Sequence, residues 1–156
     1  MRQDVAFRCG SALMLLLAAW LAFPAGAAAS LGGDESSVEA DRAHMGASVR
    51  VAGRHAYRLH EVTTPAGSTV REYASPSGVV FGVSWHGPGL PDLRQLLGRS
   101  FTHYRQAMSV RRAHRQPLSI DEPDLVIHLT GHLRSFHGRA YLPQQVPAGV
   151  VPDEIQ

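Results

Sequence analysis

Three residue types that often define function are absent or nearly absent from this chain. It has no lysine and no asparagine, and its one cysteine is Cys9. Without asparagine there is no N-glycosylation sequon. Cys9 lies before a long apolar run near the N-terminus, so removal of that run as a signal would leave a chain without cysteine. Such a chain has no disulfide, no thiol nucleophile and no cysteine-ligated metal site.

An excess of one charge is also missing. The 15 basic residues, all arginine, oppose 13 acidic residues, and the formal net charge is +2. Because Arg2, Arg8 and Asp4 precede Ser30, the chain from Ser30 onward holds 13 arginines and 12 acidic residues. Phosphate backbones are bound by concentrated basic surfaces, so this balance excludes nucleic acid as the main partner.

One segment departs from this balance. Residues 99–115 contain no acid and five arginines, namely Arg99, Arg105, Arg111, Arg112 and Arg115. Cations are favoured in the last turn of a helix, so a solvated basic helix end explains much of the run. A patch for anions or lipid headgroups is the alternative.

The single long apolar run has the organisation of a secretory signal. Two arginines precede it, residues 12–23 (ALMLLLAAWLAF) are apolar, and small residues follow as far as Ala29. Twelve residues would extend about 18 Å as a helix, short of the roughly 30 Å of a bilayer core. We therefore predict a signal peptide over residues 1–29, cleaved after Ala27 or Ala29. The mature protein is expected to be periplasmic or secreted, with no membrane span after cleavage.

The first half of the remaining chain predicts a helix and a meander. A capping-box pattern at Ser36 and Glu39 begins a short helix that ends near Met45. Turn clusters rich in Pro, Gly and Ser then separate short β-type runs, which favours antiparallel pairing. The three runs are Tyr57–Thr63, Thr69–Ala74 and Val79–His86.

The third run predicts one buried and one open face. Its odd-numbered residues are all apolar, which indicates a face turned toward the core. These residues are Val79, Phe81, Val83 and Trp85. The opposite face, with Val80, Gly82, Ser84 and His86, is expected to be at least partly open.

A helix is predicted from Pro91 to about Met108. It follows the glycine-rich connection Gly87–Leu90, and its apolar residues recur at helical spacing. Such an apolar stripe needs a sheet to cover. We therefore expect the helix to pack on the odd-numbered side chains of the third β-type run.

The last third of the chain predicts a loop, two strands and a tail. Residues 109–124 form the loop, and strict alternation from Leu125 to Arg134 indicates a strand. A turn or bulge at His137 and Gly138 would precede a final strand, Arg139–Leu142. Residues 143–156 are expected to be a weakly ordered tail.

The predicted fold class is α+β. We expect one domain over residues 30–142, with an antiparallel sheet of about five strands. One main helix would lie on one face of the sheet, together with a short N-terminal helix.

Histidine is the one functional residue type in excess, with nine copies. His128 and His132 share a strand face, but four residues at about 3.3 Å each place their backbones about 13 Å apart. His60 and His86 would join them on the open face if the strand registers agree. These four residues define a hypothesis of a histidine-based metal binder. The alternative is that they are solvated or locally hydrogen-bonded.

Ser84 and His86 form the one nucleophile-and-base pair that the spacing suggests. They share a strand face about 7 Å apart, and Gly82 precedes them as in the first half of a nucleophile elbow. The second glycine of that motif is absent, and the predicted helix begins several residues too late. A catalytic pair and a small residue beside a surface histidine both remain open. No phosphate-binding loop, paired-carboxylate site, iron motif or haem motif is present, so no cofactor is predicted.

Several segments together resemble the family called domain of unknown function 2844. The resemblance covers nearly the whole mature chain, and its most specific part is the proline-to-glycine segment 91–98. The segments are 31–33, 37–42, 70–73, 79–85, 87–88, 91–98 and 138–143. This family consists of small exported proteins of Gram-negative bacteria, so the resemblance supports export. It implies no catalytic residue.

Three functional hypotheses follow. The first is a non-catalytic exported module that binds an unknown protein partner or serves the cell envelope. The second, from a different class, is a small envelope hydrolase using Ser84 and His86. The third is the histidine-based metal binder.

Overall fold

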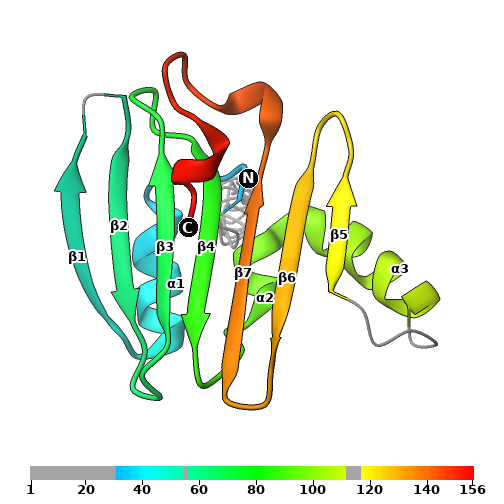
Figure 1. The fold of residues 1–156 in the computed structure, drawn as a ribbon. Helices are drawn as coiled ribbons and strands as arrows, with labels where there is room; N and C mark the ends of the chain where they lie inside the picture. Colours follow the sequence, from blue (N-terminus) through cyan, green and yellow to red (C-terminus); the bar gives the residue numbers. More distant parts are fainter. Residues whose placement is uncertain (1–30, 55, 112–116) are drawn as a thin grey trace, which may run out of the picture.

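The protein folds around one antiparallel sheet with helices on a single face (Figure 1). The computed structural model describes residues 31–54, 56–111 and 117–156, so the predicted signal peptide lies outside the described residues. The strands are β1 (Ser48–Gly53), β2 (Arg58–Thr63), β3 (Thr69–Ala74), β4 (Val80–Gly87), β5 (Leu118–Asp121), β6 (Val126–His132) and β7 (Ser135–Tyr141). The helices are α1 (Ser37–Met45), α2 (Leu93–Leu97) and α3 (Phe101–Arg111), with single 3-10 turns at Gly98–Ser100, Pro143–Gln145 and Pro152–Glu154.

The sheet joins two meanders edge to edge. Its strand order is β1-β2-β3-β4-β7-β6-β5, and every neighbouring pair is antiparallel. The segment that contains α2 and α3 carries the chain from β4 to the far edge at β5. The chain then returns through β6 to β7, which pairs with β4 at the centre of the sheet.

The α+β class is confirmed, but the sheet has seven strands rather than about five. The two additional strands are the edges. β1 is exposed along most of its length, so burial imposed no strong pattern on its sequence. β5 has only four residues and follows Pro117 in the segment predicted as a loop.

The predicted main helix is present, but it is broken. α2 begins at Leu93, capped by the Asp92 carboxylate, which accepts hydrogen bonds from the amides of Arg94 and Gln95. Gly98 then adopts φ 49°, a conformation that favours glycine, and a 3-10 turn leads into α3. The capping box predicted at Ser36 and Glu39 is wrong, because the Ser36 side chain makes no capping bond and Glu39 pairs with Arg42.

The main core lies between the sheet and the helices. Leu93, Leu96 and Leu97 of α2 pack with Val83 and Trp85 of β4. The full cluster also takes in apolar residues from α1, β2, β3, β5 and β7, including Val38, Val62, Val70, Ile120 and Ala140.

A β-bulge changes which side chains of β4 face this core. Tyr73 pairs with Gly82 but Ala74 pairs with Val80, so Phe81 has no partner in the ladder. Val80 consequently joins the helix-side core, while Phe81 packs in a second cluster. The prediction for Val83 and Trp85 is therefore right, and the prediction for Phe81 and Val80 is wrong.

That second cluster lies on the other face of the sheet, which we call the open face. The C-terminal segment, residues 143–156, folds back across it (Figure 1). Ile155 has no exposed surface, Val150 is buried, and both pack with Tyr57, Tyr73 and Phe81. The sequence suggests a loose tail here because prolines and glycine dominate it. The two apolar anchors instead fit a site formed by residues distant in the chain.

Among the described residues, no helix is long and apolar enough to cross a membrane.

Candidate functional site

The open face brings polar side chains from four strands into two rows. One row runs across the sheet through Arg71, Ser84, Arg139 and His128. The next row runs through His86, His137 and Thr130. Neighbouring strands lie about 4.8 Å apart, so both rows fit within a ligand-sized area.

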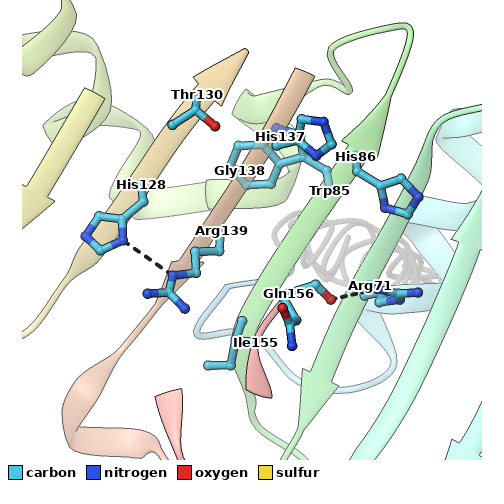
Figure 2. Close-up of a pocket in the computed structure, with 10 residues that line it drawn as sticks. All are labelled: Arg71, Trp85, His86, His128, Thr130, His137, Gly138, Arg139, Ile155 and Gln156. Carbon is cyan, nitrogen blue, oxygen red and sulfur yellow. Dashed lines mark hydrogen bonds between the residues drawn. The ribbon is translucent and has the colours of Figure 1, made fainter. Parts of the chain in front are cut away.

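All residues of these rows except Ser84 line a pocket of about 560 Å³, which we call the open-face pocket (Figure 2). This volume lies in the range of small-molecule sites. Among the described residues, two arginines and three histidines line it, and no aspartate or glutamate does. The lining residues are Arg71, Trp85, His86, His128, Thr130, His137, Gly138, Arg139, Ile155 and Gln156.

Both arginines of the pocket are held in place from outside it. The Nε of Arg71 donates to Glu61 at 2.9 Å, and its Nη1 donates to the Gln156 oxygen at 2.7 Å. The Nη1 of Arg139 donates to Asp153 and to the Pro152 oxygen, each at 3.3 Å. These carboxylates fix the guanidinium groups and offset part of their charge.

The three histidines have different partners. His128 contacts Asp121 at 2.8 Å, and its Nδ1 accepts a long bond of 3.4 Å from Arg139. The Ser119 hydroxyl and then His128 hold the pKa of Asp121 below its usual 3.8. His86 and His137 lie opposite each other on β4 and β7, with parallel rings whose centroids are 6.3 Å apart.

Trp85 and Gly138 complete the lining. A Cβ at Gly138 would lie 2.2 Å from Cζ2 of Trp85, so only glycine lets the indole pack this close to β7. Trp85 is 2% exposed, and its Nε1–H has no hydrogen-bond partner in the described part of the chain.

The structure places Ser84 and His86 on the same face, but it does not join them. Ser84 is 2% exposed and is not among the residues that line the pocket. Within the described ranges no hydrogen bond links its hydroxyl to His86, whose ring lies beside His137 instead. This geometry gives the Ser84 hydroxyl no base.

The four histidines of the metal hypothesis are separated. His60 pairs with Glu72 in the register of β2 and β3, on the helix side, and bonds Glu35 at 2.7 Å. His132 contacts the carbonyl of Leu133 in the β6–β7 turn, away from His86. No group of three or more His, Cys, Asp or Glu side chains among the described residues is arranged to hold a metal ion.

Sequence reasoning missed Arg71, Arg139 and His137 as site residues. The sequence predicts a turn or bulge at His137 and Gly138, whereas β7 runs unbroken through both and the turn is at Leu133 and Arg134. Extending the alternation backward from Tyr141 would have placed Arg139 and His137 on one face. Of the five-arginine segment, Arg99 and Arg105 do not line this pocket, and Arg112 and Arg115 lie outside the described residues.

The Gly87–Leu90 connection has a structural role. Gly87 adopts φ 145°, and a Cβ there would lie 2.5 Å from Cα of Ser68. The Ser68 hydroxyl donates to the Gly89 oxygen at 2.8 Å and accepts from the Gly89 amide at 3.1 Å. The two loops at this end of the sheet are thus tied together.

Together these features define a small α+β protein with a helix-covered sheet and a basic pocket on its open face. The chain belongs to the family described as protein of unknown function (DUF2844), whose model matches residues 27–155. This confirms the family suggested by the sequence, and the match includes most of the C-terminal segment. No curated protein and no solved structure matches the chain.

Proposed function

We propose that this protein is an exported, non-catalytic binding protein and that the open-face pocket is its binding site. The export half of the proposal is supported by the apolar run at residues 12–23 and the small residues after it. We therefore expect the mature protein to be located in the periplasm or the extracellular space.

The observation that carries the binding half is the composition of the pocket. Five cationic or cation-capable side chains converge on about 560 Å³, and the arginines are already fixed by outside partners. Preorganised polar groups lower the entropic cost of binding. Among the described residues that line the pocket, Thr130 is the one with a hydroxyl side chain, and no hydrogen bond joins it to a base; the Ser135 hydroxyl contacts Nε2 of His137 at 3.2 Å, but Ser135 does not line the pocket.

The export half is tested by cell fractionation of the full chain in a Gram-negative host. We expect a processed product in the periplasm or the medium, shortened by 27 or 29 residues according to N-terminal sequencing. An unprocessed product that stays in the cytoplasm would contradict export.

The binding half is tested by native mass spectrometry of the protein purified gently from its own cells. We expect a ligand adduct on the wild-type protein that is lost in the double variant His86→Gln/His137→Gln. The matched control is Arg94→Gln, an exposed change on α2 at the other face. An adduct retained by the double variant and lost in the control would place the binding site elsewhere.

A further inference from the structure

The ligand class can be argued from the charges that face the open-face pocket. Arg71 and Arg139 contribute permanent positive charge from β3 and β7, and no acidic side chain in the described part of the chain lines the space between them. Glu61 binds Arg71, Asp153 binds Arg139 and Asp121 binds His128, each from the edge of the pocket. A bound cation would meet two guanidinium groups, so the charges favour an anion.

The hydrogen-bonding groups agree with this sign. In both Arg71 and Arg139, the Nε and Nη1 nitrogens donate hydrogen bonds to other residues of the protein. Nη2 of each arginine makes no hydrogen bond within the described ranges, and guanidinium groups are suited to carboxylate and phosphate oxygens. His86 and His137 have no carboxylate partner in the part of the chain that the structure describes. Nε2 of His137 contacts the Ser135 hydroxyl at 3.2 Å, which leaves Nδ1 of that ring and the His86 ring for the same oxygens.

The apolar neighbours of the pocket are covered. Ile155 lies beside Gln156 at its edge but has no exposed surface (Figure 2). The Trp85 side chain packs over Gly138 on the helix side of the sheet, so its indole does not face the pocket. The charged and polar side chains are therefore the ones that a ligand would meet.

We propose that the open-face pocket binds a small molecule that carries an anionic group, a carboxylate or a phosphate. The anionic group lies toward Arg71, Arg139 and the His86–His137 pair. This inference rests on the proposed binding function and adds the chemistry of the ligand.

The test is isothermal titration of the purified protein at about pH 6, where histidines in general carry more charge than at neutral pH. Three probes of similar shape are compared: benzoate, phenyl phosphate and the neutral benzyl alcohol. We expect at least one anion to bind about tenfold or more tightly than the alcohol. Whichever anion binds more tightly distinguishes a carboxylate from a phosphate site.

Variants locate the site. His86→Gln/His137→Gln changes two exposed side chains and is expected to weaken anion binding about tenfold or more. Arg139→Gln should do the same, although it also removes the contact between β7 and Asp153 of the C-terminal segment. Arg94→Gln should bind within about twofold of wild type, because an exposed charge on the opposite face contributes little.

The contrary outcomes separate the two proposals. Equal binding of benzyl alcohol and the anions would leave the pocket as a site and overturn the anionic ligand. Anion binding that disappears with EDTA would show a metal-mediated site and also overturn it. If neither anion binds while a native adduct is still lost in the double variant, the ligand class is wrong and the binding function stands.

Discussion

Replacing Asp41 by Asn tests the electrostatics of the helix layer. Asp41 lies on α1 with no exposed surface, and its Oδ1 accepts a hydrogen bond from the Gln95 side chain on α2. Its Oδ2 has no partner within the described residues. Desolvation raises the pKa of this carboxyl from 3.8 to about 6, although the Gln95 contact opposes the shift.

The magnitude follows from linkage. A pKa raised in the folded state means that the native protein binds the proton more tightly than the unfolded chain. The stabilisation is fully present below about pH 4 and is lost as the pH rises through about 6. A shift of about 2 units corresponds to about 3 kcal/mol between pH 4 and pH 7.5.

Asp41→Asn removes this dependence and keeps an acceptor for Gln95. Its amide NH2 replaces the unpartnered Oδ2 and costs about 1–3 kcal/mol at every pH. Relative to wild type, the variant should therefore gain up to about 3 kcal/mol in free energy of unfolding as the pH rises from 4 to 7.5.

Urea denaturation followed by tryptophan fluorescence at several pH values measures this difference. Asp124→Asn, an exposed change of the same chemistry, is the control and should show no comparable trend. A pH-dependent gain for Asp41→Asn below about 0.5 kcal/mol, or one of opposite sign, would refute the desolvation argument.

Three further predictions concern stability. Ile155→Ala should lower the free energy of unfolding by about 2–4 kcal/mol and speed amide hydrogen exchange at Gln156. Val151→Ala, a change at an exposed residue, should have neither effect. Equal effects of the two variants would show that the C-terminal segment is loose. Gly138→Ala should cost about 1–3 kcal/mol and shift the tryptophan emission, because its Cβ would overlap the Trp85 ring; a wild-type spectrum and melting curve would contradict that packing. Glu35→Gln should lower the free energy of unfolding by about 1 kcal/mol at pH 7, and by less as the pH falls through the lowered pKa of Glu35. A loss of stability that stays constant down to pH 3 would contradict the ion pair of Glu35 with Arg58.

The parts of the fold that could be predicted are those where burial imposes a pattern. Apolar and polar residues alternate along much of β2, β3, β4 and β6 because one face of the sheet packs on the helices. The apolar stripe of α2 and α3 packs against that face. β1 could not be predicted because its apolar residues Val49 and Val51 are 37% and 55% exposed, so burial sets no pattern there. This edge strand forms through its pairing with β2, and pairing leaves little mark on the sequence of the strand itself.

The bulge at Phe81 shows a second limit. Val79, Phe81, Val83 and Trp85 predict one face, but the extra residue reverses the parity in the middle of the strand. Gly82, directly after Phe81, is its local sign, because a glycine inside a strand often marks a bulge. The bulge places Phe81 in one cluster with Ile155 of the C-terminal segment, a contact that the local sequence does not show.

The candidate site depends on the same long-range information. Alternation places Ser84 and His86 on the open face, and this part of the prediction is right. Arg71, Arg139 and His137 lie on strands whose register with β4 cannot be predicted from the sequence. The pocket is also enclosed by the C-terminal segment, which composition alone suggests is loose.

Photo-crosslinking in intact cells would test the open face as the binding surface most directly. A photoreactive residue would replace His137 in the pocket or, in a second strain, Arg94 on the helix side. We expect a crosslinked product from position 137 that is absent from position 94. Crosslinks of equal yield from both positions, or from position 94 alone, would contradict the open-face pocket as the place where this protein binds.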